Sequence, residues 1–200
     1  MDKESTKNSI LTCALKLFSS EGYKGVTVDQ IAKAVGIKAP SLYKHYNGKR
    51  DIFDSIVRRM QERDAAKAQR AQMPETASVE DETTPSLALI KTYSLEMFRY
   101  WTEEEFSSDF RKMLTLEQYR NEEMAQLYRM YLSSGPTEYM TAVFTRLFGA
   151  DEAEQLALEF YAPMHLLYSV YDTSEDKTAA VKLLEKHIDR FTARTKTRIE

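Results

Sequence analysis

Residues Val26 to Phe53 read VTVDQIAKAVGIKAPSLYKHYNGKRDIF, and this stretch decides the fold of the N-terminal part of the chain. Thr27 stands directly before an apolar-periodic run and Gln30 follows three residues later, which is the pattern of a capping box. Apolar residues then recur at the spacing of one helix face until Gly36, a residue that ends helices in a left-handed conformation without a Cβ penalty. The stretch therefore begins with a short, well-bounded helix.

A second, shorter helix is predicted after it. Pro40 suits a first helical position, and residues 41–46 would make fewer than two turns. Leu42 and Tyr46, at i and i+4, would give it an inward edge. Its outward edge would present Ser41, Tyr43, Lys44 and His45, which bring hydrogen-bond donors and a cation but no carboxylate. Two short helices joined by a glycine-containing turn form a helix-turn-helix, whose second helix enters the DNA major groove. The alternative is an ordinary helical hairpin with a solvated polar face.

Lys49 and Arg50 open the next predicted helix, although cations at a helix N-terminus oppose the helix dipole. A phosphate at that end would explain them, because free backbone N–H groups and positive side chains both favour an anion. This placement favours the DNA-binding interpretation.

The same residues resemble the DNA-binding signature of TetR-family transcriptional regulators, over about the first quarter of the chain. The resemblance implies a C-terminal effector pocket. It also implies that ligand occupancy swings the helix predicted from Lys49 onward. This movement would change the separation of the two recognition helices of a dimer. The segments that carry the resemblance are TVDQIA at 27–32, Gly36, SLYKHY at 41–46 and Lys49.

We expect Tyr43 and His45 to enter the groove, with Lys38, Ala39, Ser41 and Lys44 beside them. Thr27, the Val28 amide, Tyr46 and Lys49 are expected to contact phosphates. Ala39 cannot hydrogen-bond a base, so readout there is limited to a thymine methyl. The predicted DNA-binding residues are Thr27, Val28, Lys38, Ala39, Ser41, Tyr43, Lys44, His45, Tyr46 and Lys49.

Composition points to an all-α protein. The 200 residues include only 6 Gly and 5 Pro. The single Cys excludes an intramolecular disulfide and suits a reducing cytosol. The first residues, MDKESTKNSI, lack the apolar core of a signal peptide, and no apolar run approaches the length of a membrane span. We therefore expect a cytoplasmic protein without membrane contact.

Charge is distributed unevenly along the chain. Residues 1–73 hold 14 Lys and Arg against 8 Asp and Glu, whereas the remaining 127 residues hold 14 against 23. A basic N-terminal module on an acidic body is the electrostatic pattern of a polyanion-binding protein.

The predicted domains are a helix-turn-helix DNA-binding domain at 1–48, a connecting helix at 49–73, and a helical effector-binding and dimerisation domain at 74–200. The acidic stretch PETASVEDETTP at 74–85 has no periodic apolar pattern, so it is interpreted as a loop at the domain boundary.

The last two predicted helices carry apolar seams typical of helix bundles. The helix at 152–171 is apolar on two sides, and Pro163 predicts a kink or a break in it. Two such helices from each of two chains would form a four-helix interface. The alternative is that both bury their seams within one chain. The predicted interface residues of the homodimer are Leu156, Phe160, Leu167, Tyr168, Tyr171, Val181, Leu184, Ile188 and Phe191.

Aromatic residues are concentrated between Tyr93 and Tyr171, where 16 of the 22 lie together with six Met. Such residues either pack a core or line an adaptable apolar cavity for a small hydrophobic effector. The candidate lining residues are Met97, Trp101, Phe110, Met113, Tyr128, Tyr131, Phe144, Tyr161, Met164 and His165.

Enzymatic function is not expected. His45, His165 and His187 are far apart in sequence without metal-ligand spacing, and neither a phosphate loop nor a nucleophile motif occurs. No metal or cofactor is predicted. The hypothesis is a homodimeric repressor that a small hydrophobic effector releases from a palindromic operator in double-stranded DNA. The alternatives are an architectural or division-control DNA-binding protein of the same fold without an effector, and a helical protein–protein adaptor.

Overall fold

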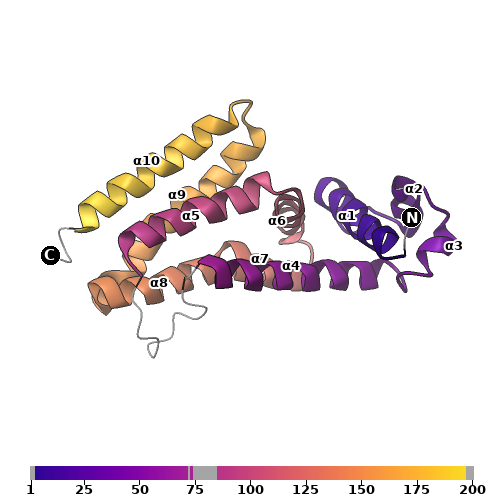
Figure 1. Cartoon of the computed structure of the whole chain (residues 1–200), viewed down its shortest axis with the longest axis horizontal. Helices are drawn as coiled ribbons and strands as arrows, with labels where there is room; N and C mark the ends of the chain where they lie inside the picture. The colour runs from indigo at the N-terminus through magenta and orange to yellow at the C-terminus, as the bar shows by residue number, and fades with distance from the viewer. Residues whose placement is uncertain (1–2, 72, 74–84, 197–200) are drawn as a thin grey trace. The chain divides into compact units, whose positions relative to one another are not determined.

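The computed structural model describes residues 3–71, 73 and 85–196. Within these ranges every regular element is an α-helix and no strand occurs (Figure 1), so the predicted all-α class is confirmed. The predicted acidic loop at 74–85 lies outside the described residues except for Pro85. None of the described helices is long and apolar enough to cross a membrane.

The chain forms two compact units, which are residues 1–66 with 105–128, and residues 67–104 with 129–200. The first unit therefore combines the N-terminal helices with a segment from the middle of the chain, and this division differs from the predicted boundary at residue 74. Its helices are α1 (Lys3–Glu21), α2 (Val28–Val35), α3 (Ala39–Leu42), the first part of α4 (Lys49–Ala71), α6 (Glu105–Glu117) and the first part of α7 (Glu122–Leu132).

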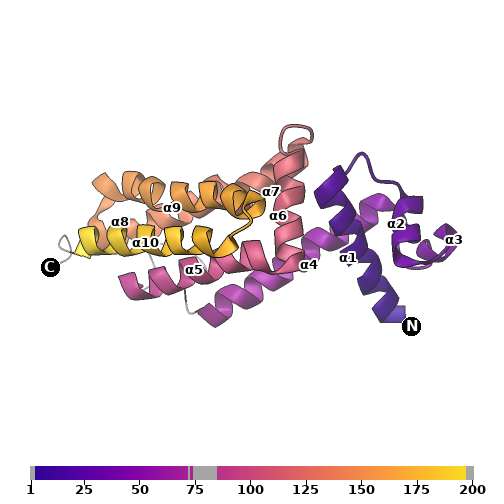
Figure 2. The ribbon, with the colours of Figure 1, turned by 90° about the horizontal axis from the view of Figure 1, so that it is seen from above.

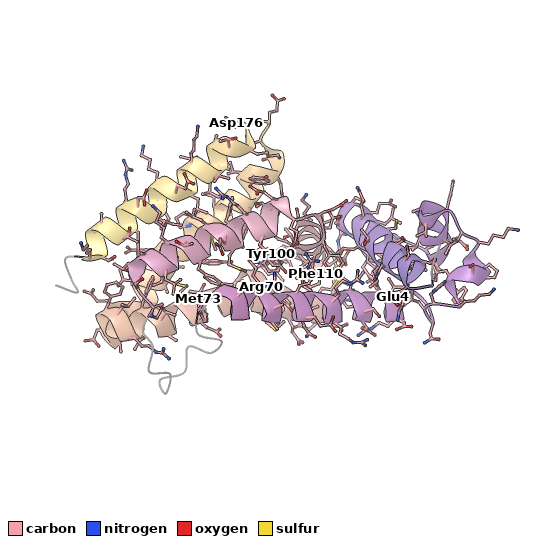
Figure 3. All side chains as sticks on the ribbon, in the orientation of Figure 1. Glu4, Arg70, Met73, Tyr100, Phe110 and Asp176 are labelled. Carbon is pink, nitrogen blue, oxygen red and sulfur yellow. The ribbon has the colours of Figure 1, made fainter. Side chains whose placement is uncertain are left out.

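Aromatic and aliphatic side chains from all parts of the first unit form its core. Phe18 of α1 and Phe53 of α4 are almost completely buried, and Tyr23 lies against both rings, at centroid distances of 5.1 and 5.4 Å. Phe110 of α6, labelled in Figure 3, is also fully buried. Because α6 packs against α1, a segment distant in sequence completes the hydrophobic core around the N-terminal helices.

The second unit is a bundle of α5 (Leu87–Glu103), α8 (Ser134–Phe148), α9 (Ala150–Thr173) and α10 (Lys177–Lys196). Helix α9 packs against the other three, and α10 runs beside it in both views (Figures 1 and 2). Phe144, Phe160 and Phe191 join α8, α9 and α10 in an aromatic core with centroid distances of 4.9–5.6 Å.

Pro163 does not break α9, which runs without interruption from Ala150 to Thr173. Proline has no N–H to donate within a helix. Close to this position the Phe160 carbonyl accepts a hydrogen bond from His187 Nε2 of α10, at 3.0 Å. The His187 side chain thus joins α10 to α9 three residues before Pro163.

The predicted dimer seam packs largely within its own chain, and its role in a dimer stays a prediction. Seven of its nine residues are at most 7% exposed within their own chain, because α5, α8 and the paired helix cover them. The exposed apolar side chains of α9 and α10 lie elsewhere, namely Leu158, Leu166, Val170 and Leu183. The buried seven are Leu156, Phe160, Leu167, Tyr168, Leu184, Ile188 and Phe191, whereas Tyr171 and Val181 are half-buried.

Candidate nucleic-acid interface

Helix α2 has the local structure that the sequence predicts. The Thr27 hydroxyl accepts from the Gln30 N–H at 3.2 Å, while the Gln30 side-chain oxygen accepts from the Thr27 N–H at 2.7 Å. Gly36 ends the helix with φ 78° and ψ 27°, and the Ile37 N–H returns to the Ala32 carbonyl at 2.9 Å. The capping box and the left-handed helix end are both confirmed.

The second helix is shorter than predicted. Helix α3 covers only Ala39–Leu42, but turns continue it, because the His45 and Tyr46 N–H groups both donate to the Leu42 carbonyl at 2.9 and 3.1 Å. So short a helix cannot form alone in water and depends on its neighbours. We name residues 38–46 the recognition segment.

The recognition segment has a buried and an exposed edge. Leu42 and Tyr46 are 0% and 2% exposed, which confirms the predicted inward edge. Tyr43 is 55% exposed and Lys44 is exposed as well. His45 is half-buried, and its Nδ1 atom has no hydrogen-bond partner among the described residues. Of the two residues expected in the groove, Tyr43 presents the larger free surface.

The remaining predicted contact residues lie around this edge. Lys38 forms the N-cap position of α3 and is exposed, whereas Ala39 and Ser41 are half-buried. Thr27 is exposed and Val28 is half-buried at the start of α2. The fold thus brings the starts of α2 and α3 into one module with the exposed Tyr43 and Lys44.

Tyr46 is held from inside the unit. Its hydroxyl donates to the Lys7 carbonyl of α1 at 3.3 Å, and the Lys7 ammonium lies 5.6 Å from the ring centroid. Burial raises the pKa of Tyr46 to about 12. A phosphate contact through this hydroxyl would require it to leave the Lys7 carbonyl, so in this structure Tyr46 anchors the recognition segment to α1.

Lys49 also has partners that the sequence pattern did not indicate. Its ammonium donates to the carbonyls of Tyr23 and Val26, both at 2.8 Å, and lies 4.5 Å from the Tyr23 ring centroid. Burial lowers the pKa of Lys49, and the Glu117 carboxylate opposes that shift. The cation that opens α4 therefore holds the loop before α2, which gives its position a structural reason besides phosphate binding.

Arg50 forms exposed ion pairs with two acidic residues. Its guanidinium bonds both carboxylate oxygens of Glu123 at 2.7 Å and one oxygen of Asp54 at 2.8 Å. The Asp54 pair follows the i,i+4 helix rule. Glu123 is 73 residues away in sequence, so no local signal pointed to it.

The predicted effector-binding residues fall in both units. Phe110 and Met113 are fully buried in the first unit, and Tyr128 is half-buried there. The other seven belong to the second unit, where Trp101 and Tyr131 are in edge contact at 5.9 Å. Those seven are Met97, Trp101, Tyr131, Phe144, Tyr161, Met164 and His165.

Two of these candidates already have packing roles. Phe144 belongs to the aromatic core of the second unit. Tyr161 is 6% exposed, and its hydroxyl donates to the Leu132 carbonyl at 3.0 Å, which satisfies the polar end of a buried tyrosine.

This geometry defines an all-α helix-turn-helix protein, and comparison with known proteins supplies the family. Residues 10–56 match the family model described as bacterial regulatory proteins, tetR family. The sequence is 46% identical over 52 residues to the biofilm operon icaADBC HTH-type negative transcriptional regulator IcaR of Staphylococcus aureus strain Newman. That match covers 26% of this chain and 28% of the relative, so the chain aligns with little more than a quarter of the curated protein.

Solved structures extend the likeness to the whole fold. A TetR-family transcriptional regulator from Agrobacterium tumefaciens has a TM-score of 0.65 at 18% identity, with 94% of this chain and 98% of that chain covered. The SmeT–triclosan complex has a TM-score of 0.64 at 16% identity, with 95% and 91% covered. The N-terminal module is thus a TetR-family DNA-binding region on a chain with the TetR-family fold, and the resemblance expected from the sequence is confirmed.

Proposed function

We propose that the protein is a transcriptional repressor that binds a palindromic operator as a homodimer and leaves it when a small hydrophobic molecule binds. The recognition segment supports this proposal most directly, because Leu42 and Tyr46 seat it on the first unit while Tyr43 and Lys44 face outward. The IcaR relative is a negative transcriptional regulator, and the tetR family model matches residues 10–56, which contain this segment.

Tyr43 and Lys44 are the principal groove residues in this proposal. Ser41, Ala39 and His45 contribute smaller surfaces beside them. Thr27, the Val28 amide and Lys38 contact phosphates at the starts of α2 and α3, where free backbone N–H groups favour anions. Tyr46 and Lys49 support the surface from within. The single O–H of Tyr46 reaches a phosphate only by leaving the Lys7 carbonyl, whereas the Lys49 ammonium has a third N–H besides the two that donate to carbonyls.

The dimer forms through the exposed side of α9 and α10. Leu158 and Leu166 are 53% and 64% exposed on α9, and Leu183 is 55% exposed on α10. Large apolar side chains exposed on two adjacent helices support a protein contact there. Two chains joined in this way would present two recognition segments to the two half-sites of a palindrome.

In this proposal the effector binds in the C-terminal helical domain. The SmeT structure, which has the same fold, is described as a complex with triclosan, a small molecule. The candidates for contact in the second unit that the aromatic core does not include, and that have no packing role named above, are Met97, Trp101, Tyr131, Met164 and His165. Binding would shift α4 and thereby the spacing of the recognition segments.

The test is selection of bound sites from random duplex DNA with the purified protein, at low and at moderate salt. We expect an enriched inverted repeat with half-sites about one helical turn apart, and an affinity that falls steeply with salt. Salt-sensitive binding without enrichment would support an architectural role instead. Absence of binding would support the adaptor hypothesis.

A pair of tyrosine variants tests the groove contact. Tyr43→Ala should lose more affinity for the selected site than for random DNA, because base contacts carry specificity whereas phosphate contacts do not. Tyr119→Ala is the matched control, since Tyr119 is 89% exposed in the same unit but outside the module. Equal losses on both DNAs would remove Tyr43 from the groove.

A further inference from the structure

Glu117 is a buried carboxylate of the first unit, whereas the other acidic residues described there are exposed or half-buried. Glu117, the last residue of α6, is 1% exposed. Acidic side chains are almost never fully buried without a partner, because the charge loses its hydration. Glu117 lies outside residues 10–56, so the DNA-binding signature does not include it.

The carboxylate packs directly against the loop between α1 and α2. Its Oε1 atom accepts a hydrogen bond from the Tyr23 N–H at 3.1 Å. Gly22 has φ 78°, and a Cβ atom there would lie 2.6 Å from the same oxygen. The positive φ favours glycine here, and a Cβ atom would also require the Glu117 carboxylate to shift from its present position.

The charge of Glu117 is only partly compensated. The Arg120 Nη1 atom lies 3.7 Å from Oε1 in an ion pair. The buried Oε2 atom has no hydrogen-bond partner in the described part of the chain. A buried charge that is only partly compensated contributes little to the stability of the fold. The contribution of Glu117 is therefore the position that it gives to the residues it contacts.

Lys49 holds the same loop from its other side. The Tyr23 residue donates its N–H to Glu117 and accepts at its carbonyl from Lys49, which also binds the Val26 carbonyl. Val26 directly precedes Thr27, the residue that caps α2. The path from Glu117 to the first turn of α2 thus spans only the residues from Tyr23 to Thr27.

We infer that Glu117 is a positioning residue of the DNA-binding surface. As the acceptor for the Tyr23 N–H, it fixes the loop at 22–26 and thereby the position of α2 and of the recognition segment that follows it. This inference rests on the proposed DNA binding. According to this inference, the fit of the N-terminal module to DNA depends on a hydrogen bond that a residue of α6 accepts.

Two variants separate the hydrogen bond from the packing. Glu117→Gln keeps an acceptor oxygen of the same reach, whereas Glu117→Met keeps a similar volume without an acceptor. Glu105→Gln is the control, because Glu105 is an exposed carboxylate of the same helix that contacts Lys16 of α1. The affinity of each variant for the duplex selected by the wild type, and amide hydrogen exchange at Tyr23 without DNA, are the two measurements.

We expect Glu117→Gln and Glu105→Gln to bind within about threefold of the wild type. Glu117→Met should lose about tenfold, which corresponds to the loss of one hydrogen bond. In Glu117→Met the Tyr23 amide should exchange faster, while the amides of Ile31 and Ile52, buried residues in the first turns of α2 and α4, keep their protection.

Three results would overturn the inference. The first is equal DNA affinity in Glu117→Met and Glu117→Gln, whether both are retained or both are lost. The second is unchanged exchange at Tyr23 in Glu117→Met. The third is loss of protection at Ile31 and Ile52 together with Tyr23, which would assign Glu117 a role in folding only. A wild-type protein that binds no duplex would refute the proposed function instead, and the exchange measurement does not depend on that outcome.

Discussion

The helix-turn-helix module and the α9–α10 pair show two different ways in which sequence encodes structure. In the module, the cap at Thr27, the helix end at Gly36 and the buried edge at Leu42 all lie where the sequence predicts them. In the α9–α10 pair, the helices form as predicted, but the apolar seam faces its own chain. An apolar seam in the sequence therefore indicates that a helix face is buried. It does not identify which helices cover that face.

The largest effect is expected from adjacent residues of α10. Leu184→Ala should lower the free energy of unfolding by about 2–5 kcal/mol, because Leu184 is 0% exposed and its loss leaves a cavity. Leu183→Ala, at a position that is 55% exposed, should change the stability of the single chain by less than about 0.5 kcal/mol. Urea denaturation at low protein concentration measures both.

The same pair of variants sharpens the assignment of the dimer face. Sedimentation velocity should show a smaller dimer fraction for Leu183→Ala than for the wild type. A folded Leu184→Ala protein that loses its dimer while Leu183→Ala keeps it would restore the originally predicted seam as the interface.

Gly36→Ala should cost about 1–2 kcal/mol, the penalty for a residue with a Cβ in the left-handed conformation. Apart from the residues adjacent in the chain, no atom lies within 4 Å of the position that the Cβ would take, so the cost is conformational. Gly36→Asn should cost less, since asparagine tolerates this conformation. Equal thermal unfolding of the wild type and Gly36→Ala would show that α2 can end in another way.

Thr27→Ala should cost about 1 kcal/mol, because it removes the side-chain acceptor of the Gln30 N–H and leaves that donor without its cap. Thr27→Ser keeps the hydroxyl and should remain close to the wild type in chemical denaturation. If the serine variant were as unstable as the alanine variant, the Thr27 methyl group would matter more than its hydroxyl.

Tyr46→Phe should show the smallest effect, a loss of about 1 kcal/mol at neutral pH from the missing hydrogen bond to Lys7. The folded protein raises the pKa of Tyr46 from 10.0 to about 12. The unfolded chain therefore releases the hydroxyl proton first, and the stability of the wild type falls as the pH rises from 10 through about 12.

The phenylalanine variant has no such proton, so the difference between the two proteins should narrow in this pH range. Denaturation curves recorded at neutral and alkaline pH would show it. A constant difference would mean that Tyr46 titrates equally in the folded and unfolded states.

The DNA-binding class and much of the recognition segment were predictable because their signals are local. A cap, a helix-ending glycine and a pair of inward residues at i and i+4 act within one or two helical turns. The partners of the charged residues were not predictable in this way. Lys49 reaches carbonyls 23 and 26 residues away, Arg50 reaches Glu123 at a separation of 73, and Tyr23 reaches Glu117 at a separation of 94.

The sequence by itself thus determined the helical class, the ends of α2 and the buried edge of the recognition segment, since these depend on neighbouring residues. Tertiary structure alone decided that Lys49 holds a loop, that Tyr46 is anchored on α1, and that the seam of α9 and α10 is covered by its own chain. The physical reason is distance along the chain. A hydrogen bond or a buried face depends on which groups packing brings within a few ångströms, and that information is spread over the whole sequence.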